Sequence, residues 1–304
     1  MRVMKTRQAT KWIINLLTLL ATIYACSPLD QPTLPSTQIP ATSTHQQTLT
    51  PTPPTDTSTA TQTPLGCLNQ PGRLDAGKLE STNPAQEYFI YLPPCYDEKT
   101  DERYPVLYLL HGQTYTYDQW IRLGTVDVID DLILSGESMP FIIVFPDDRY
   151  WNLQAGSGFG QRLVNDLIPY IDQNYRTIRD RDQRAIGAMS RGAGWALRLG
   201  LTSWQLFGTI GLHSLAVLQK DSSKISAWMS DIPRASQPRV FMDVGDNDQE
   251  LTMAQLVEEQ FNRYGLSHEW HLYSGAHTEE YWKAHVEEYM RWYAEGWNNP
   301  QFSR

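Results

Sequence analysis

The chain has 304 residues, of which 41% are hydrophobic and 19% charged, so it is too apolar for a disordered protein and too long for a small disulfide-stapled fold. Its 25 basic and 34 acidic residues give a net charge of −9, and four of the basic residues lie before residue 12. From Cys67 onward 21 basic residues stand against 32 acidic ones. Nucleic acids and anionic membranes bind basic surfaces, so this part of the chain is not expected to bind either.

The first predicted element is a secretory signal peptide over residues 1–26. Its basic residues precede a short apolar run over residues 12–24, which is short for a membrane-spanning helix. The run ends in Ile23-Tyr24-Ala25-Cys26, which resembles a bacterial lipobox. We therefore predict lipidation of Cys26, with ordinary secretion and an uncleaved anchor as alternatives. In each case the body lies outside the cytoplasm. For a lipoprotein, the lipid at Cys26 is the only membrane contact expected.

Residues 27–65 are predicted to form a disordered tether. Thr, Pro and Ser occupy 22 of the 36 positions from 31 to 66, with almost no charge. Such a segment buries too little apolar surface to offset the entropy lost on ordering. The globular domain is therefore predicted over residues 66–304.

The cysteine count predicts one disulfide. If Cys26 carries a lipid, Cys67 and Cys95 are the pair that remains, and thiols in an oxidising compartment are expected to bond. The bond would stabilise the domain by about 3 kcal/mol in the loop-entropy treatment. Two free thiols are the alternative.

The domain alternates between short apolar stretches and longer stretches with helical spacing. This alternation predicts an α/β fold with a mostly parallel central sheet and helices on both faces. The predicted strands are Glu87–Leu92, Val106–Leu110, Phe141–Phe145, Arg184–Ala188, Thr209–Leu212, Val240–Val244 and Glu269–Tyr273. The predicted helices are Val126–Leu134, Gln161–Tyr175, Gly192–Leu201, Thr252–Tyr264 and Glu279–Trp297. Two strands, Val106–Leu110 and Phe141–Phe145, are apolar throughout, so we expect them at the sheet centre.

A candidate nucleophile follows one of these strands. Ser190 stands between the strand Arg184–Ala188 and a run of small residues that opens a helix. This layout is typical of a nucleophile elbow, a tight turn that exposes a serine hydroxyl at a helix N-terminus. The flanking residues Ala188 and Gly192 give A-x-S-x-G in place of G-x-S-x-G. The match is weak by itself and gains weight from the residues that follow.

The acid and base candidates occur in the order Ser, acid, His that the α/β-hydrolase fold requires. Asp248 and its rival Asp246 follow the strand Val240–Val244, and His277 follows the strand Glu269–Tyr273. Sites of open α/β sheets lie at such strand ends. We therefore predict His277 as general base towards Ser190, with Asp248 fixing its tautomer.

Two main-chain donors are predicted for the oxyanion. One is the N–H of Arg191, directly after the nucleophile, and the other is the N–H of Gln113 in the loop after the strand Val106–Leu110. His111 is expected to be structural. The side chain of Arg191 would bind an anionic group or point to solvent, and we expect the solvent.

Together these residues resemble the esterase D family of α/β-hydrolases, which includes feruloyl and acetyl-xylan esterases, S-formylglutathione hydrolase and mycolyltransferases. The resemblance covers most of residues 85–297. It is carried by residues 104–112 with Trp120, Phe145-Pro146-Asp147, residues 166–171 with Asn174-Tyr175-Arg176, the Ser190 turn, and Gly275-Ala276-His277 with Tyr281-Trp282. It implies ester hydrolysis through an acyl-enzyme without metal or cofactor, with Ser190, Asp248 and His277 as the triad.

Aromatic residues in the loops indicate the substrate class. Tyr115 and Trp120 follow one strand and Trp151 another, which predicts a rim suited to a sugar or a phenolic acyl group. Closing the loops over the core is their alternative role. We therefore predict an exported serine esterase acting on carbohydrate-linked acetyl or feruloyl esters, or on small esters. An acyltransferase with the same triad and a non-catalytic surface binding module are the alternative functions.

Overall fold

An eight-stranded sheet forms the centre of the computed structural model, which describes residues 66–149 and 158–298. The predicted signal peptide, Cys26 and the tether lie outside the described residues. The strands are β1 (Arg73–Leu79), β2 (Gln86–Leu92), β3 (Val106–Leu110), β4 (Ile142–Pro146), β5 (Arg184–Met189), β6 (Thr209–His213), β7 (Arg239–Gly245) and β8 (Glu269–Tyr273). Their order is β1-β2-β4-β3-β5-β6-β7-β8. Strands β3 to β8 run parallel, while β2 is antiparallel to both β1 and β4.

The seven predicted strands are confirmed, each within one residue at either end. The sequence analysis missed β1. Most residues of this edge strand are exposed or half-buried. Exposed and half-buried residues do not alternate regularly along its sequence, which is Arg-Leu-Asp-Ala-Gly-Lys-Leu. Pairing with β2 therefore holds these residues in a strand, and no alternation of apolar and polar residues in their sequence predicts it.

The helices are α1 (Gln119–Arg122), α2 (Thr125–Leu134), α3 (Phe159–Arg162), α4 (Ile168–Asn174), α5 (Ser190–Thr202), α6 (Ile225–Ser230), α7 (Leu251–Tyr264) and α8 (Glu279–Asn298). The helix predicted over Gln161–Tyr175 is α3 and α4 joined by a π-turn, Leu163–Leu167. Helices α1 and α6 were not predicted because four and six residues are too few to show a helical period. No helix in residues 66–149 or 158–298 is long and apolar enough to cross a membrane.

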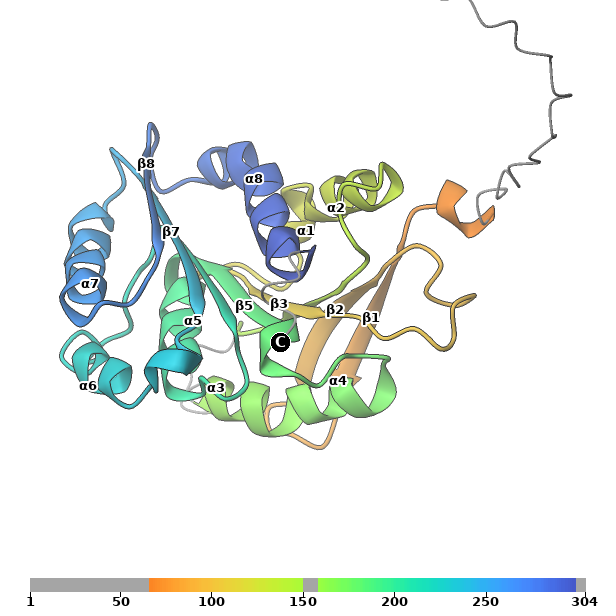
Figure 1. Cartoon of the computed structure of the whole chain (residues 1–304), viewed down its shortest axis with the longest axis horizontal. Coiled ribbons are helices and arrows are strands. Elements are labelled where there is room, and N and C mark those ends of the chain that lie inside the picture. Colours follow the sequence, from red (N-terminus) through yellow and green to blue (C-terminus); the bar gives the residue numbers. More distant parts are fainter. Residues whose placement is uncertain (1–65, 150–157, 299–304) are drawn as a thin grey trace, which may run out of the picture. The chain divides into compact units, whose positions relative to one another are not determined.

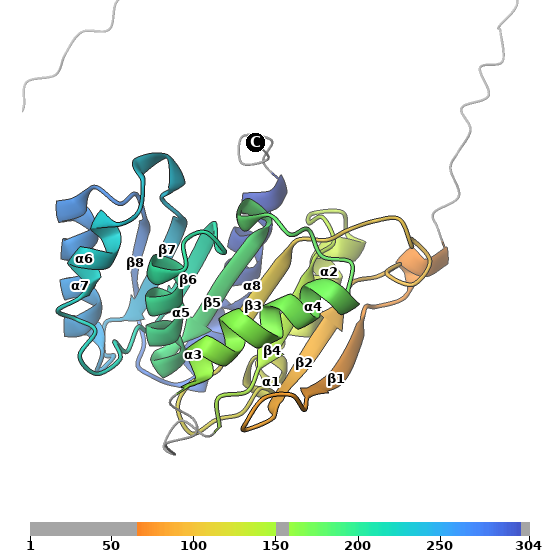
Figure 2. The ribbon, with the colours of Figure 1, turned by 90° about the horizontal axis from the view of Figure 1, so that it is seen from below.

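The helices cover both faces of the sheet, as the sequence predicts. In Figures 1 and 2, α3, α4, α5, α6 and α7 lie on one side of the sheet, and α1, α2 and α8 lie on the other. The central strand β3 sends alternate side chains into two separate apolar clusters, so Tyr108 packs with the α5 side and Leu107 and Leu109 with the α8 side. All five residues of β3 are buried. The protein therefore has an α/β-hydrolase type of sheet whose parallel strands end on one edge.

A disulfide joins Cys67, in the short 3₁₀ turn η1 (Gly66–Asn69), to Cys95 after β2. The two Cα atoms are 5.0 Å apart. The bond closes a loop that includes β1, so it fastens the edge of the sheet to the segment that precedes it.

Replacing both cysteines by serine is expected to lower the free energy of unfolding by about 3 kcal/mol, because the unfolded chain then gains the freedom of a loop of 28 residues. Guanidinium titration of the variant beside the oxidised parent measures this change. Equal midpoints for the two proteins would contradict it.

Candidate active site

Ser190 occupies the turn between β5 and α5 in a left-handed backbone conformation, with φ of 55°. All six residues of β5 are buried, and the chain turns from the strand directly into the helix. A Cβ at Gly192 would lie 2.4 Å from the carbonyl oxygen of His111, so only glycine fits there. Ala188, by contrast, carries a buried Cβ in the same turn, and Ser190 still adopts its left-handed conformation. The elbow therefore tolerates alanine at the position where glycine is usual.

Ser190, His277 and Asp248 form a hydrogen-bonded chain. Ser190 Oγ donates to His277 Nε2 at 2.8 Å, and His277 Nδ1 donates to the two carboxylate oxygens of Asp248 at 2.9 and 3.0 Å. The donor roles follow from the network, since a carboxylate can only accept. The three residues come from the ends of β5, β8 and β7, which lie at the same edge of the sheet. The geometry is that of a serine nucleophile with an oriented base.

The carboxyl of Asp248 is held in its charged form. Its side chain is fully buried, and burial alone would raise its pKa. Hydrogen bonds from His277, from the N–H of Glu250 and from Ser214 outweigh the burial. They hold the pKa of Asp248 below its ordinary value, so a negative charge faces the imidazole.

Asp246, the rival acid, has a different role in the structure. It is exposed, and its Oδ1 accepts a hydrogen bond from the N–H of Gly275 at 3.0 Å. Asp246 therefore shapes the loop that carries His277. The structure brings Asp248, and not Asp246, to the imidazole.

Two polar residues near the triad were missed by the sequence analysis. Ser214 follows β6 with φ of 50°. Its hydroxyl is one of the hydrogen-bond donors that lower the pKa of Asp248, and it accepts a hydrogen bond from the Trp282 indole at 3.0 Å. The ring of Trp282 also packs edge-on against His277, with ring centroids 5.0 Å apart. Because β6 lies between β5 and β7, the position of Ser214 at a strand end was the available signal.

Gln119 is the second missed residue. Its side-chain oxygen accepts from the N–H of Gly112 at 2.8 Å, and its amide nitrogen donates to Glu279 at 3.1 Å. Gln119 is fully buried and so links the loop after β3 to the first residue of α8, two residues after His277. No sequence signal marked this residue, since a buried glutamine has no pattern of its own.

The predicted oxyanion donors lie on either side of the nucleophile. A Cβ at Gly112 would lie 3.5 Å from Cβ of Ser190, so the loop that carries Gln113 passes directly beside the serine. Arg191 is the second residue of α5, at the helix N-terminus directly after the nucleophile. The two predicted donors therefore stand on neighbouring segments, one on each side of Ser190.

Two predictions about side chains near the site were wrong. Trp120, placed on the substrate rim, is 0% exposed, and its indole donates to the carbonyl of Leu110 at 2.8 Å. It closes the loop over the core, because its ring packs against His213 and Tyr289. Arg191, expected to point to solvent, instead forms an ion pair with Asp148.

Of the other two predicted rim residues, the structure describes one. Tyr115 is 37% exposed, and the guanidinium of Arg122 lies 5.7 Å from its ring centroid. Trp151 lies outside the described residues. Among the three predicted rim residues, Tyr115 is thus the one that the structure shows to be exposed to a substrate.

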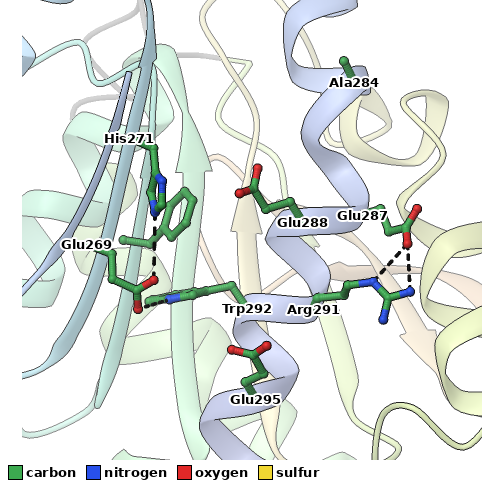
Figure 3. A pocket seen from close by; sticks show the side chains of 9 residues that line it. Glu269, His271, Ala284, Glu287, Glu288, Arg291, Trp292 and Glu295 are labelled. Atoms are coloured by element: carbon green, nitrogen blue, oxygen red, sulfur yellow. Dashed lines mark hydrogen bonds and ion pairs between the residues drawn. The ribbon is translucent and has the colours of Figure 1, made fainter. Parts of the chain in front are cut away.

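A separate groove of about 560 Å³ lies between β8 and α8. Figure 3 shows Glu269 and His271 facing Glu288, Trp292 and Glu295 across it. None of the predicted site residues lines this groove. Within residues 66–149 and 158–298 there is also no group of three or more His, Cys, Asp or Glu placed to hold a metal ion. The predicted catalytic residues meet instead around Ser190, and this cluster is the candidate active site.

Comparison with curated proteins finds esterases. The chain is 35% identical over 146 residues to an endo-1,4-beta-xylanase/feruloyl esterase of Xylanibacter ruminicola, covering 44% of this chain and 20% of that protein. It is 34% identical over 148 residues to an esterase of Mycobacterium tuberculosis, covering 46% of this chain and 31% of that protein. The chain thus spans a fifth to a third of the length of these relatives.

Solved structures show the same fold. A ferulic acid esterase matches with a TM-score of 0.67 and 25% identity, over 74% of this chain and 99% of that one. An S-formylglutathione hydrolase of Staphylococcus aureus matches with a TM-score of 0.58 and 15% identity, over 73% and 97%. The family described as "Putative esterase" matches residues 80–293, which is most of the chain. The chain belongs to this esterase family.

Proposed function

We propose that the protein is a serine esterase that hydrolyses carboxylic esters through an acyl-enzyme formed on Ser190. The observation that carries this proposal is the hydrogen-bonded chain from Ser190 through His277 to the buried Asp248. Membership of the esterase family supports the same reaction class.

The chemistry follows from the roles of the three side chains. Ser190 Oγ attacks the ester carbonyl carbon while His277 Nε2 takes its proton, and Asp248 stabilises the resulting imidazolium. The tetrahedral intermediate expels the alcohol, which takes the proton from His277. A water molecule then repeats the attack on the acyl-enzyme and releases the acid. The N–H groups of Gln113 and Arg191 would hold the oxyanion both when the acyl-enzyme forms and when it is hydrolysed.

The proposed substrates are carbohydrate-linked feruloyl or acetyl esters. This choice is supported by the names of the relatives, one a feruloyl esterase joined to a xylanase and one a ferulic acid esterase. The exposed ring of Tyr115 offers a surface on which a phenolic or sugar ring can stack.

We further propose that the enzyme works outside the cytoplasm, held by a lipid on Cys26. The Cys67–Cys95 disulfide supports an oxidising compartment, because thiols in the cytoplasm are kept reduced. Incorporation of labelled palmitate into the parent chain and its loss in Cys26→Ala tests the anchor. Incorporation in both proteins would contradict it.

Incubation with methyl ferulate, p-nitrophenyl acetate and acetylated xylo-oligosaccharides tests the function. We expect release of free acid from at least one ester, detected by liquid chromatography and mass spectrometry. Appearance of the acyl group on a sugar hydroxyl in place of free acid would make the protein an acyltransferase. Glycan binding without turnover would make it a binding module.

The acid role of Asp248 is tested against a matched neighbour. Asp248→Asn is expected to lower kcat by about 10³-fold, since the amide no longer fixes the tautomer and charge of His277. Asp246→Asn keeps an oxygen for the Gly275 N–H and should change kcat by less than about threefold. Steady-state hydrolysis of p-nitrophenyl acetate measures both. The reverse order would move the acid role to Asp246.

A further inference from the structure

The two proposed oxyanion donors belong to different segments, and a third segment joins them. Gln113 follows β3 and Arg191 follows β5, while Asp148 follows β4, two residues beyond Pro146. In the sheet β3 lies between β4 and β5, so the end of β4 must reach past β3 to contact α5. We propose that Asp148 is a positioning residue that sets the geometry of the oxyanion hole from both sides. This inference rests on the proposed esterase function.

The first connection runs through the main chain of Asp148. Its N–H donates to His111 Nε2 at 2.8 Å, and His111 Nδ1 lies 2.7 Å from the carbonyl oxygen of Gly112. Since a main-chain N–H can only donate, Nε2 carries the lone pair and Nδ1 carries the proton. Asp147 Oδ1 lies farther from the same Nε2, at 3.4 Å. The ring, 2% exposed, is thus fixed as the tautomer that donates to Gly112.

This hydrogen bond acts on the donor peptide itself. The carbonyl of Gly112 and the N–H of Gln113 belong to one planar peptide unit, which is trans. The two groups point in opposite directions, so fixing the carbonyl fixes the direction of the N–H. His111, expected to be structural, therefore aims the Gln113 N–H that would meet the oxyanion.

The second connection runs through the carboxylate of Asp148. Its Oδ2 accepts hydrogen bonds from the guanidinium of Arg191 and, at 3.0 Å, from the indole of Trp195. Both donors lie on the first turns of α5, and the side chains of Asp148 and Arg191 are only 5% and 16% exposed. The ion pair therefore ties down the helix N-terminus that carries the Arg191 N–H. It also neutralises a cation that stands beside the nucleophile.

The expected effect is on catalysis more than on substrate binding. Donors aimed at the oxyanion act in the transition state, and a misplacement of about 1 Å costs up to about 100-fold in rate. Asp148→Asn removes the charge that holds Arg191 and leaves the main-chain connection in place. We therefore expect kcat to fall by about 10- to 100-fold while KM stays within about threefold.

The second readout is a trifluoromethyl ketone. Ser190 Oγ adds to its carbonyl carbon, the serine proton passes to His277, and the resulting oxyanion enters the same hole. If Asp148 positions the hole, inhibition by the ketone weakens by the same factor as kcat/KM falls. A variant that had only lost stability would bind the ketone normally in its folded fraction.

Asp221→Asn is the matched control. Asp221 is also a buried carboxylate, 2% exposed, and it pairs with Arg198 of the same helix at 2.6 Å, two turns beyond Arg191. We expect its kcat and ketone affinity to stay within about twofold of the parent. If Asp148→Asn fails to fold, Arg191→Gln breaks the same ion pair from its more exposed end, and the same fall in kcat is expected.

The outcomes separate the inference from the proposed function. An active parent whose kcat and ketone affinity are unchanged by Asp148→Asn, or reduced equally by Asp221→Asn, overturns the inference and leaves the esterase standing. A parent that neither turns over p-nitrophenyl acetate nor binds the ketone overturns both.

Discussion

Ser190→Ala is expected to lower kcat for ester hydrolysis by at least about 10⁴-fold. No acyl-enzyme forms without the hydroxyl, and the remaining catalysis comes from the oxyanion donors and substrate binding alone. The fold should persist, because alanine keeps the Cβ of a residue that already adopts φ of 55°. We expect the free energy of unfolding to change by less than about 1 kcal/mol. Steady-state kinetics and denaturant titration measure the two quantities.

Ser203→Ala is the control for this change. Ser203 lies at the opposite end of α5 and takes no part in the hydrogen-bonded chain from Ser190 to His277. Its variant should retain the parent kcat. Turnover by Ser190→Ala within tenfold of the parent would remove Ser190 as nucleophile.

His277→Ala is expected to lower kcat by a similar factor, about 10⁴-fold. The hydroxyl of Ser190 then has no base at 2.8 Å, and Asp248 keeps a buried charge without the imidazole that faced it. Because the His277 side chain is 16% exposed, the space left by the ring opens to solvent. Added imidazole should therefore restore part of the activity, which a plate assay with p-nitrophenyl acetate detects.

His271→Ala provides the comparison. His271 lies in the groove between β8 and α8, away from Ser190, and stacks on Phe241. Its loss should leave kcat within about threefold of the parent, and imidazole should not change the rate once the hydrolysis by imidazole alone is subtracted. Equal losses in His277→Ala and His271→Ala would show that the His277 effect is not specific.

The sheet was predictable because its strands have strong local signals. The apolar residues of Val106–Leu110 are buried on both faces, which leaves few other structures open to them. The edge strand β1 lacked such a signal, since only pairing with β2 orders it. The same reason hid α1 and α6, whose few residues are helical through contacts with the rest of the fold.

The contact among Ser190, His277 and Asp248 was predictable because each of these residues follows a strand. Ser190, Asp248 and His277 carry chemistry that a reader can recognise, and parallel strands bring their ends together. Their supporting residues were not predictable in the same way. Gln119 and Ser214 act through contacts across 160 and 34 residues, to Glu279 and Asp248, which no local pattern encodes.

The two wrong predictions concerned the direction in which a side chain points. Trp120 follows a strand, as a rim residue would, yet its indole turns inward to the carbonyl of Leu110. Arg191 stands beside the nucleophile, yet its guanidinium meets Asp148, 43 residues earlier in the chain. Chain position predicted where each residue lies, while the packing partner decided where its side chain points.

Labelling with a fluorophosphonate, followed by peptide mass spectrometry, tests the central claim most directly because it needs no choice of substrate. The reagent bonds to an activated serine and displaces fluoride. We predict one adduct, on Ser190, in the parent chain, and its loss in the folded His277→Ala variant. A folded parent chain that takes no label, or takes it on another serine, would contradict the account.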